Sequence, residues 1–302
     1  MTQRVYINDV GPRDGLQNQA SILSPEQRLD LIHALREAGL KSIEAGSFVS
    51  PKAVPAMAGA AEIFAGLPED GASYQALIPN LRGYELARAA GVKKILMVVC
   101  ATETMNQKNV RASIAEGLKA TQDIVVQAKR DGIQTLACVA VAWECPFEGL
   151  TDRDAVFGIV QAFFDMGVDE VVVADTIGAA HPESVHELMS TLVGFHGAER
   201  LACHFHDTRA MGVANVYAAL TAGIRKFDAS VGGLGGCPFA PGATGNVATE
   251  DVVMMLQQMG YETGINLTKL MAAGQLAGEF LGLQTGGRAH TWRQLQVDKG
   301  KL

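Results

Sequence analysis

The sequence lacks any apolar run that approaches the ~18–20 residues needed to span a bilayer. It also lacks a basic tract: 25 Lys and Arg residues stand against 32 Asp and Glu residues, and the formal net charge is −7. Such an acidic chain offers no electrostatic footprint for nucleic acid or an anionic membrane, so we expect neither as a partner. A substrate that carries phosphate groups must then be held by a local cluster of side chains.

Targeting signals and regularly spaced cysteines are also lacking. Residues 1–4 lead directly into a strand-like run at 5–7, so we expect no signal or transit peptide and a cytoplasmic location. The five cysteines are irregularly spaced, and Cys138 and Cys145 are too far apart for a zinc-ribbon pair. We expect four of them to pack as small apolar residues in a reducing cytosol. Cys237 differs, because its neighbours are glycine and proline.

Short apolar, β-branched runs alternate with longer amphipathic stretches. Several of these runs are continuously apolar, as strands buried on both faces of a parallel sheet are. The expected strands are 4–10, 41–46, 73–78, 93–100, 133–141, 169–175, 200–206 and 225–231. The expected helices include 25–38, 109–130, 153–166, 182–195, 208–222 and 267–281.

Eight such units predict a (β/α)₈ TIM barrel in a single catalytic domain over 1–302, with 261–302 as a short C-terminal helical appendage. A doubly wound open sheet is the main alternative. It is disfavoured because no G-x-G-x-x-G follows the first strand.

A glycine-rich segment at 230–246 holds six glycines and two prolines around Cys237 and closes on Asn246. So much glycine lets the backbone turn sharply and approach a ligand closely. The thiol there is either an incidental small side chain or a positioned acid or nucleophile.

Polar residues follow the ends of several expected strands, where barrel enzymes carry their active sites. They are Arg13, Asp14, Glu44, Asp175, His204 and His206, with the glycine-rich segment after the eighth strand. We therefore expect one active site assembled from distant segments at a single rim.

His204 and His206 are two residues apart, so on a strand both side chains face the same side. With Asp14 and an asparagine on neighbouring loops they predict a divalent-metal site, although a hydrogen-bonded core role is the alternative. A mixed nitrogen and oxygen donor set without a thiolate cage favours Mg²⁺ or Mn²⁺ over structural zinc.

The remaining charged residues leave two interpretations open. Arg13 either pairs with Asp14 or turns toward the substrate to stabilise an oxyanion. Glu44 and Asp175 are expected to face the lumen, either with a direct role or as partners that support Arg13 or the histidines.

Longer motifs connect these residues to a known family. The sequence resembles hydroxymethylglutaryl-CoA lyases, metal-dependent barrel lyases related to isopropylmalate and homocitrate synthases. The resemblance rests on VGPRDGLQN at 10–18, IEAGSFVSPK at 43–52, DTIG at 175–178, HFHDT at 204–208, SVGGLGGCP at 230–238 and GATGNVATED at 242–251.

This resemblance implies retro-Claisen cleavage of 3-hydroxy-3-methylglutaryl-CoA to acetyl-CoA and acetoacetate, a step of leucine degradation, in a homodimer. It implies a cation held by Asp14, His204, His206 and Asn246, with Asp14 or a histidine as the base. By the same resemblance Arg13 would stabilise the enolate, Cys237 would donate a proton to it, and Glu44 and Asp175 would be supporting carboxylates. Lys108 and Asn109 match a segment that contacts CoA.

The chain also departs from the family pattern. Gly232 and Phe239 replace an alanine and a tyrosine, Arg209 follows the histidine motif in an unusual context, and Cys138 stands where a tyrosine is expected. The reaction class is therefore better supported than the substrate. Another branched 3-hydroxyacyl-CoA such as citramalyl-CoA is the first alternative, and a non-catalytic metal-binding subunit is the second.

Overall fold

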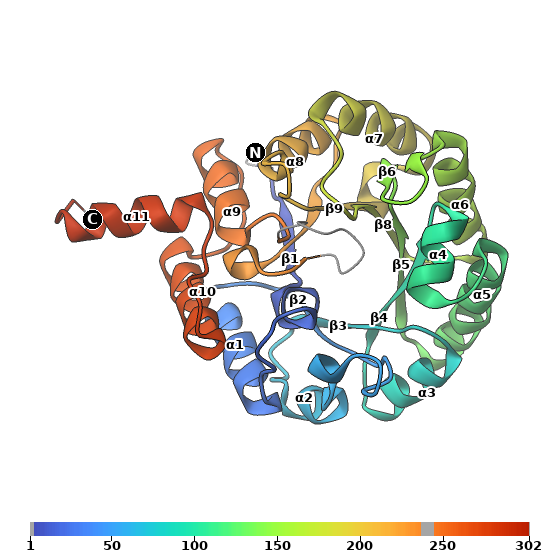
Figure 1. The fold of residues 1–302 in the computed structure, drawn as a ribbon, viewed down its shortest axis with the longest axis horizontal. Coiled ribbons are helices and arrows are strands. Elements are labelled where there is room, and N and C mark those ends of the chain that lie inside the picture. The colour runs from blue at the N-terminus through green and yellow to red at the C-terminus, as the bar shows by residue number, and fades with distance from the viewer. Residues whose placement is uncertain (1–2, 237–244, 302) are drawn as a thin grey trace.

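The computed structural model describes residues 3–236 and 245–301 and forms a closed barrel of eight parallel strands surrounded by helices (Figure 1). In spatial order the strands are β1, β10, β9, β8, β5, β4, β3 and β2, and β2 pairs with β1 to close the ring. Their bounds are β1 Tyr6–Asp9, β2 Ser42–Ser47, β3 Ser73–Leu77, β4 Lys94–Cys100, β5 Gln134–Ala140, β8 Glu170–Asp175, β9 Leu201–Phe205 and β10 Lys226–Ala229. The predicted barrel is confirmed, and the closed ring excludes the open sheet.

Helices follow the strands around the outside of the ring (Figure 1). Their bounds are α1 Pro25–Glu37, α2 Ala60–Gly66, α3 Leu81–Ala89, α4 Glu103–Val110, α5 Ile114–Asp131, α6 Arg153–Met166, α7 Pro182–His196, α8 Gly212–Thr221, α9 Thr249–Gln258, α10 Leu267–Leu281 and α11 Arg288–Asp298. A two-stranded hairpin joins β6 (Glu144–Cys145) to β7 (Gly149–Leu150) above the barrel. Within the described part of the chain, we find no helix both long and apolar enough to cross a membrane.

The single helix predicted over 109–130 is wrong, because two helices share this stretch. Arg111 adopts a left-handed backbone with φ 58° and ends α4. Ser113 then begins α5 with a reciprocal cap: its Oγ accepts from the Glu116 N–H, and the Glu116 carboxylate accepts from the Ser113 N–H. The predicted helix at 208–222 also begins later, at Gly212.

The barrel has an outer and an inner packing region. The main core lies between strands and helices, and the four described cysteines are buried, as predicted for small apolar residues. Inside the barrel a separate apolar cluster comes from β4, β5, β8 and β9: Leu96, Leu136, Cys138, Val172, Ala174 and Ala202. The opposite strands β10, β1, β2 and β3 contribute buried polar side chains instead, among them Asp228, Glu44 and Gln75. The lumen is therefore apolar on one side and polar on the other.

The C-terminal residues form the predicted helical appendage. α10 packs against α1 and α9, and α11 packs against α9 and extends away from the ring (Figure 1). α10 covers the predicted range 267–281.

Candidate active site and metal centre

A cavity of about 260 Å³ opens at the carboxyl ends of the strands. Its polar lining includes Arg13, Asp14, His204, His206 and Asp228. Its apolar lining includes Leu96, Val98, Cys138, Ala140 and Ala174 from β4, β5 and β8. The cavity therefore inherits the two-sided character of the lumen.

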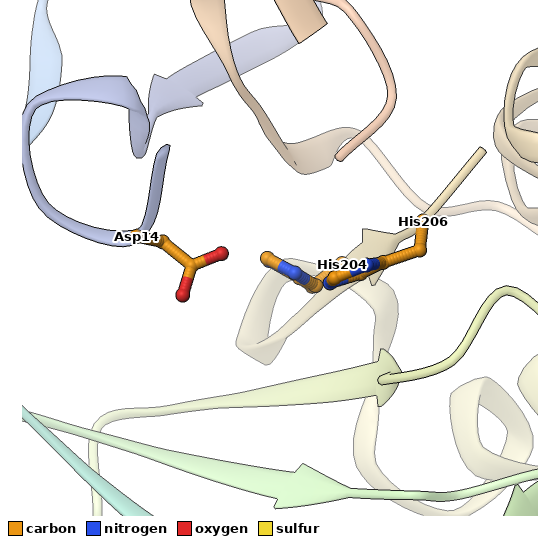
Figure 2. Close-up of side chains that lie close together, drawn as sticks. All are labelled: Asp14, His204 and His206. Carbon is orange, nitrogen blue, oxygen red and sulfur yellow. The ribbon is translucent and has the colours of Figure 1, made fainter. Parts of the chain in front are cut away.

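Three side chains converge at this cavity, as Figure 2 shows: Asp14 faces the rings of His204 and His206. One ligand atom from each lies within 4.8 Å of the others. Asp14 belongs to a π-helical turn (Gly11–Gly15) that follows β1, whereas His204 lies on β9 and His206 just beyond it. The strand alternation predicted for the two imidazoles thus brings them together.

Asn246, the last residue of the glycine-rich segment, completes the group. Its backbone bridges to that of His206, and its Nδ2 donates to Asp14 Oδ2 at 2.8 Å and to the Leu234 carbonyl at 3.0 Å. Asn246 Oδ1 and His206 Nδ1 are buried without a hydrogen-bond partner among the described residues. Buried polar atoms are normally paired, so these two have capacity for a ligand. A carboxylate, two imidazoles and an amide oxygen fit a divalent cation.

The surrounding charges and burial favour the deprotonated forms of Asp14 and His206, which can bind a cation. Burial alone raises the pKa of Asp14, but Arg13 and the two imidazoles outweigh it and bring this pKa to about 2. Burial and the neighbouring His204 lower the pKa of His206 to about 4. At neutral pH Asp14 is therefore a carboxylate and His206 a neutral imidazole, the states that bind metal ions. Burial lowers the pKa of His204, but Asp228 and Asp14 more than offset it, so the net shift is upward.

Arg13 is clamped between two carboxylates. Its Nη1 donates to Asp14 Oδ1 at 2.7 Å, its Nη2 donates to Glu44 Oε2 at 2.9 Å, and its Nε lies 2.9 Å from Glu44 Oε1. Burial lowers the pKa of Arg13, but Glu44 and Asp14 raise it further, so the guanidinium stays charged. Arg13 thus pairs with Asp14 and also lines the cavity, while its role at an oxyanion stays a prediction. Glu44 lies behind Arg13, where it fixes the guanidinium plane.

Asp175 does not face the lumen, contrary to expectation. Its Oδ1 accepts from the Ala179 N–H at 2.8 Å and its Oδ2 from the Ala180 N–H at 3.1 Å. Its neighbours Ala174 and Thr176 line the cavity instead, because side chains alternate along a strand. Asp175 therefore shapes the turn that follows β8.

The two residues predicted to contact CoA lie on α4 near the cavity. Asn109 lines it, and its Nδ2 lies 3.7 Å from Cys100 Sγ. Lys108 is exposed, with its ammonium 4.8 Å from the centre of the Phe147 ring. Cys237 lies outside the described residues. The preceding Gly236 lines the cavity, and its carbonyl accepts from Asn18 Nδ2 at 2.9 Å.

Asp228 lies at the site but was not predicted from the sequence. It pairs in register with His204 across β10 and β9, and its carboxylate reaches that imidazole. A signal was present, because residues two apart on the expected strand 225–231 face the same side, but no motif distinguishes this carboxylate. Asn18 was also missed, although it closes the 10–18 motif.

The turn that carries Asp14 is anchored by a buried carboxyl group at Asp9. Its Oδ1 accepts from the Gly11 N–H at 2.8 Å, and its Oδ2 accepts from Thr249 Oγ1 at 2.7 Å. Burial nevertheless raises the pKa of Asp9 from 3.8 to about 7. Between these values the folded protein holds a proton that the unfolded chain has released, so the free energy of unfolding falls as pH rises across this window.

This gives a first prediction for Asp9→Asn. The amide keeps the size of the side chain but cannot ionise, so the variant should lose less stability than the wild type between pH 4 and pH 8. The difference between the two proteins should change by up to ~4 kcal/mol over that range. Melting temperatures measured across the range test it, and parallel pH profiles for the two proteins would contradict it.

The fold and the site together define a class: a (β/α)₈ barrel whose carboxyl rim carries a candidate divalent-metal centre beside a buried arginine. Comparison with known families goes further. The HMGL-like family model matches residues 4–277, and the chain belongs to this family.

The relatives cover nearly the whole chain. Hydroxymethylglutaryl-CoA lyase of Pseudomonas mevalonii is 41% identical over 95% of this chain and 96% of its own. (R)-citramalyl-CoA lyase of Chloroflexus aurantiacus is 40% identical over 93% of this chain and 92% of its own. A solved HMG-CoA lyase of Acinetobacter baumannii, in complex with coenzyme A and 3-methylmalate, is 38% identical, with a TM-score of 0.91 over 94% of this chain and 93% of its own.

Proposed function

We propose that this protein is a metal-dependent carbon–carbon lyase that cleaves 3-hydroxy-3-methylglutaryl-CoA to acetyl-CoA and acetoacetate. The observation that carries the proposal is the convergence of Asp14, His204, His206 and Asn246 beside Arg13 at one cavity. Family membership and the named activities of the relatives support the same reaction class.

Asp14, His204, His206 and Asn246 would hold the cation, which we propose to be Mg²⁺ or Mn²⁺ on the basis of the oxygen and nitrogen donors. When bound, it would make the 3-hydroxyl group of the substrate more acidic. Asp14 would take the hydroxyl proton, and the C2–C3 bond would then break toward a thioester enolate.

The developing enolate oxygen needs positive charge with fixed geometry. Arg13 supplies it from a guanidinium that Glu44 already orients, so little reorganisation is required. We propose that the Cys237 thiol returns a proton to the enolate carbon. Asp175 would act only indirectly, through the turn after β8.

The CoA portion would lie across α4. Asn109 already lines the cavity, and the exposed Lys108 offers a local positive charge on an otherwise acidic protein. The relative solved with coenzyme A bound supports an acyl-CoA substrate. A homodimer, a cytoplasmic location, a role in leucine degradation and one catalytic domain over 1–302 remain part of this proposal.

A second substrate is favoured by one feature of the cavity. Its far wall carries small or apolar side chains at Cys138, Ala140 and Ala174, where the family resemblance leads us to expect a tyrosine at position 138. Such a wall would accept a different or larger apolar branch on the acyl group. The 3-hydroxy-3-isohexenylglutaryl thioester, a named substrate of one relative, carries such a branch. Citramalyl-CoA, the named substrate of another relative, keeps the methyl branch and places its carboxylate one methylene closer, so it stays an alternative through the family resemblance.

The decisive assay uses the purified protein with a panel of branched 3-hydroxyacyl-CoA thioesters, in Mg²⁺ or Mn²⁺ and after treatment with a chelator. We expect acetyl-CoA release from the 3-hydroxy-3-methylglutaryl thioester, loss of this activity on chelation and recovery when the cation returns. Activity with citramalyl-CoA alone would shift the proposal to the second substrate. Full activity after verified removal of metal would contradict the mechanism, and inactivity on the whole panel would favour a non-catalytic metal-binding subunit.

A further inference from the structure

A column of four polar side chains runs through the polar half of the lumen. Ser42 Oγ donates to Asn8 Oδ1 at 2.8 Å, and Asn8 Nδ2 donates to Asp228 Oδ1 at 2.8 Å. Asp228 Oδ2 lies 3.2 Å from His204 Nδ1. The four residues come from the adjacent strands β2, β1, β10 and β9, so the barrel itself sets their spacing.

The hydrogen bonds of this column all run in one direction, from donor to acceptor, as far as Asp228. Ser42 donates to the Asn8 oxygen, which leaves the Asn8 amide nitrogen as the donor to Asp228. A carboxylate only accepts hydrogen bonds, so the His204 contact requires a proton on Nδ1. In the neutral ring the lone pair is then on Nε2, the nitrogen left to bind a cation.

The two imidazoles differ in this respect. His206 Nδ1 is buried and has no hydrogen-bond partner in the described ranges, whereas His204 Nδ1 is held by Asp228. Asp228 is only 6% exposed and separates two cavities. The second cavity, about 280 Å³ at the amino ends of the strands, is also lined by Lys94, which interacts electrostatically with Asp228.

We propose that Asp228 is a positioning residue that fixes the tautomer of His204 and so presents Nε2 to the cation. It acts through the imidazole and has no part in the bond-breaking step. Carboxylate partners of this kind orient metal-bound histidines and raise their basicity, and their loss typically weakens metal affinity ~10–100-fold. The inference rests on the cation of the proposed function and is independent of which thioester is cleaved.

Asp228→Asn tests the inference with little change of shape. The amide oxygen can still accept from Asn8, while its NH₂ group donates to His204 Nδ1 and drives the proton to Nε2. We expect Mn²⁺ affinity, measured by electron paramagnetic resonance, to fall ~10–100-fold. Long-range ¹H–¹⁵N spectra of histidine-labelled, metal-free protein at mildly alkaline pH should show His204 change from the Nδ1–H to the Nε2–H form.

Asp169→Asn is the matched control. It removes the same charge near the amino end of β8, where the Asp169 carboxylate accepts from the Thr135 N–H and hydroxyl. It should alter neither readout. A folded Asp228→Asn protein with unchanged Mn²⁺ affinity or an unchanged tautomer would overturn the inference alone.

The wild-type protein provides a test that needs no variant. An Nε2–H tautomer of His204 in the metal-free wild type, with the signal assigned by its loss in His204→Gln, would also overturn the inference. Failure of the wild type to bind Mn²⁺ is a distinct outcome, because it would remove the cation of the proposed function and this inference with it.

Discussion

Arg13→Lys should lower kcat roughly 10²–10³-fold, the loss that follows removal of one oxyanion donor in other enzymes. The positive charge is retained, but an ammonium cannot reproduce the planar fork that meets Glu44 through two nitrogens and Asp14 through a third. Glu44 has a fully buried side chain, so it would lose part of its ion pair with Arg13. Steady-state kinetics on the thioester that the panel identifies provide the measurement.

Arg28→Lys is the control that separates chemistry from burial. Arg28 lies on α1, is 1% exposed, donates to the carbonyls of Ala45, Ala56 and Ala58, and does not line the cavity. Its substitution should lower the melting temperature but leave kcat within a few-fold. If Arg13→Lys lost no more activity than Arg28→Lys, the role of Arg13 at the enolate would be refuted.

The barrel could be predicted because its strands leave a direct record in the sequence. Several strands buried on both faces read as continuous apolar runs, and each of the eight predicted strands overlaps one strand of the barrel. The break between α4 and α5 was harder to predict from the sequence. Arg111 rather than glycine adopts the left-handed conformation there, so the residue type that normally marks a helix end is missing.

The metal centre could be predicted for a similar reason. Alternation along β9 places His204 and His206 on one side whatever surrounds them, and strand ends meet at one rim. Asp175, the last residue of β8, was predicted to face the lumen, but its neighbour Ala174 does so instead. Which of two adjacent residues faces inward depends on where the strand sits in the ring, and this information is not local.

The lumen of the barrel is divided into a polar and an apolar side. Polar and charged groups on β10, β1 and β2 are paired with one another or with Arg13, and the facing wall of β4, β5 and β8 is apolar. Ion pairs and hydrogen bonds are stronger in such an environment than in water. Under the proposed function, the same wall would receive the apolar part of the acyl group, so a change in this wall would alter both substrate choice and the strength of the nearby ion pairs.

Asp14→Asn should abolish tight metal binding and reduce kcat/KM by roughly 10³-fold or more, because a bound cation supplies several kcal/mol of charge stabilisation. Asp14 is the only carboxylate in the candidate ligand set, and its pKa of about 2 keeps it charged throughout the working range. Arg13 would lose one of its two anionic partners in the same substitution. Calorimetric titration with Mn²⁺ and steady-state kinetics measure the two effects.

A double variant that exchanges Asp14 and Asn246 tests this last prediction further. Asn246 Nδ2 lies 2.8 Å from Asp14 Oδ2, so Asp14→Asn combined with Asn246→Asp moves the carboxylate to the neighbouring ligand position without changing the ligand charge. We expect partial recovery of Mn²⁺ affinity relative to the single variant. The recovery should be incomplete, because the new carboxylate would face the Leu234 carbonyl that Asn246 now bonds. If Asp14→Asn alone bound Mn²⁺ as tightly as the wild type, this aspartate would not be a ligand and the cation would have to be held elsewhere.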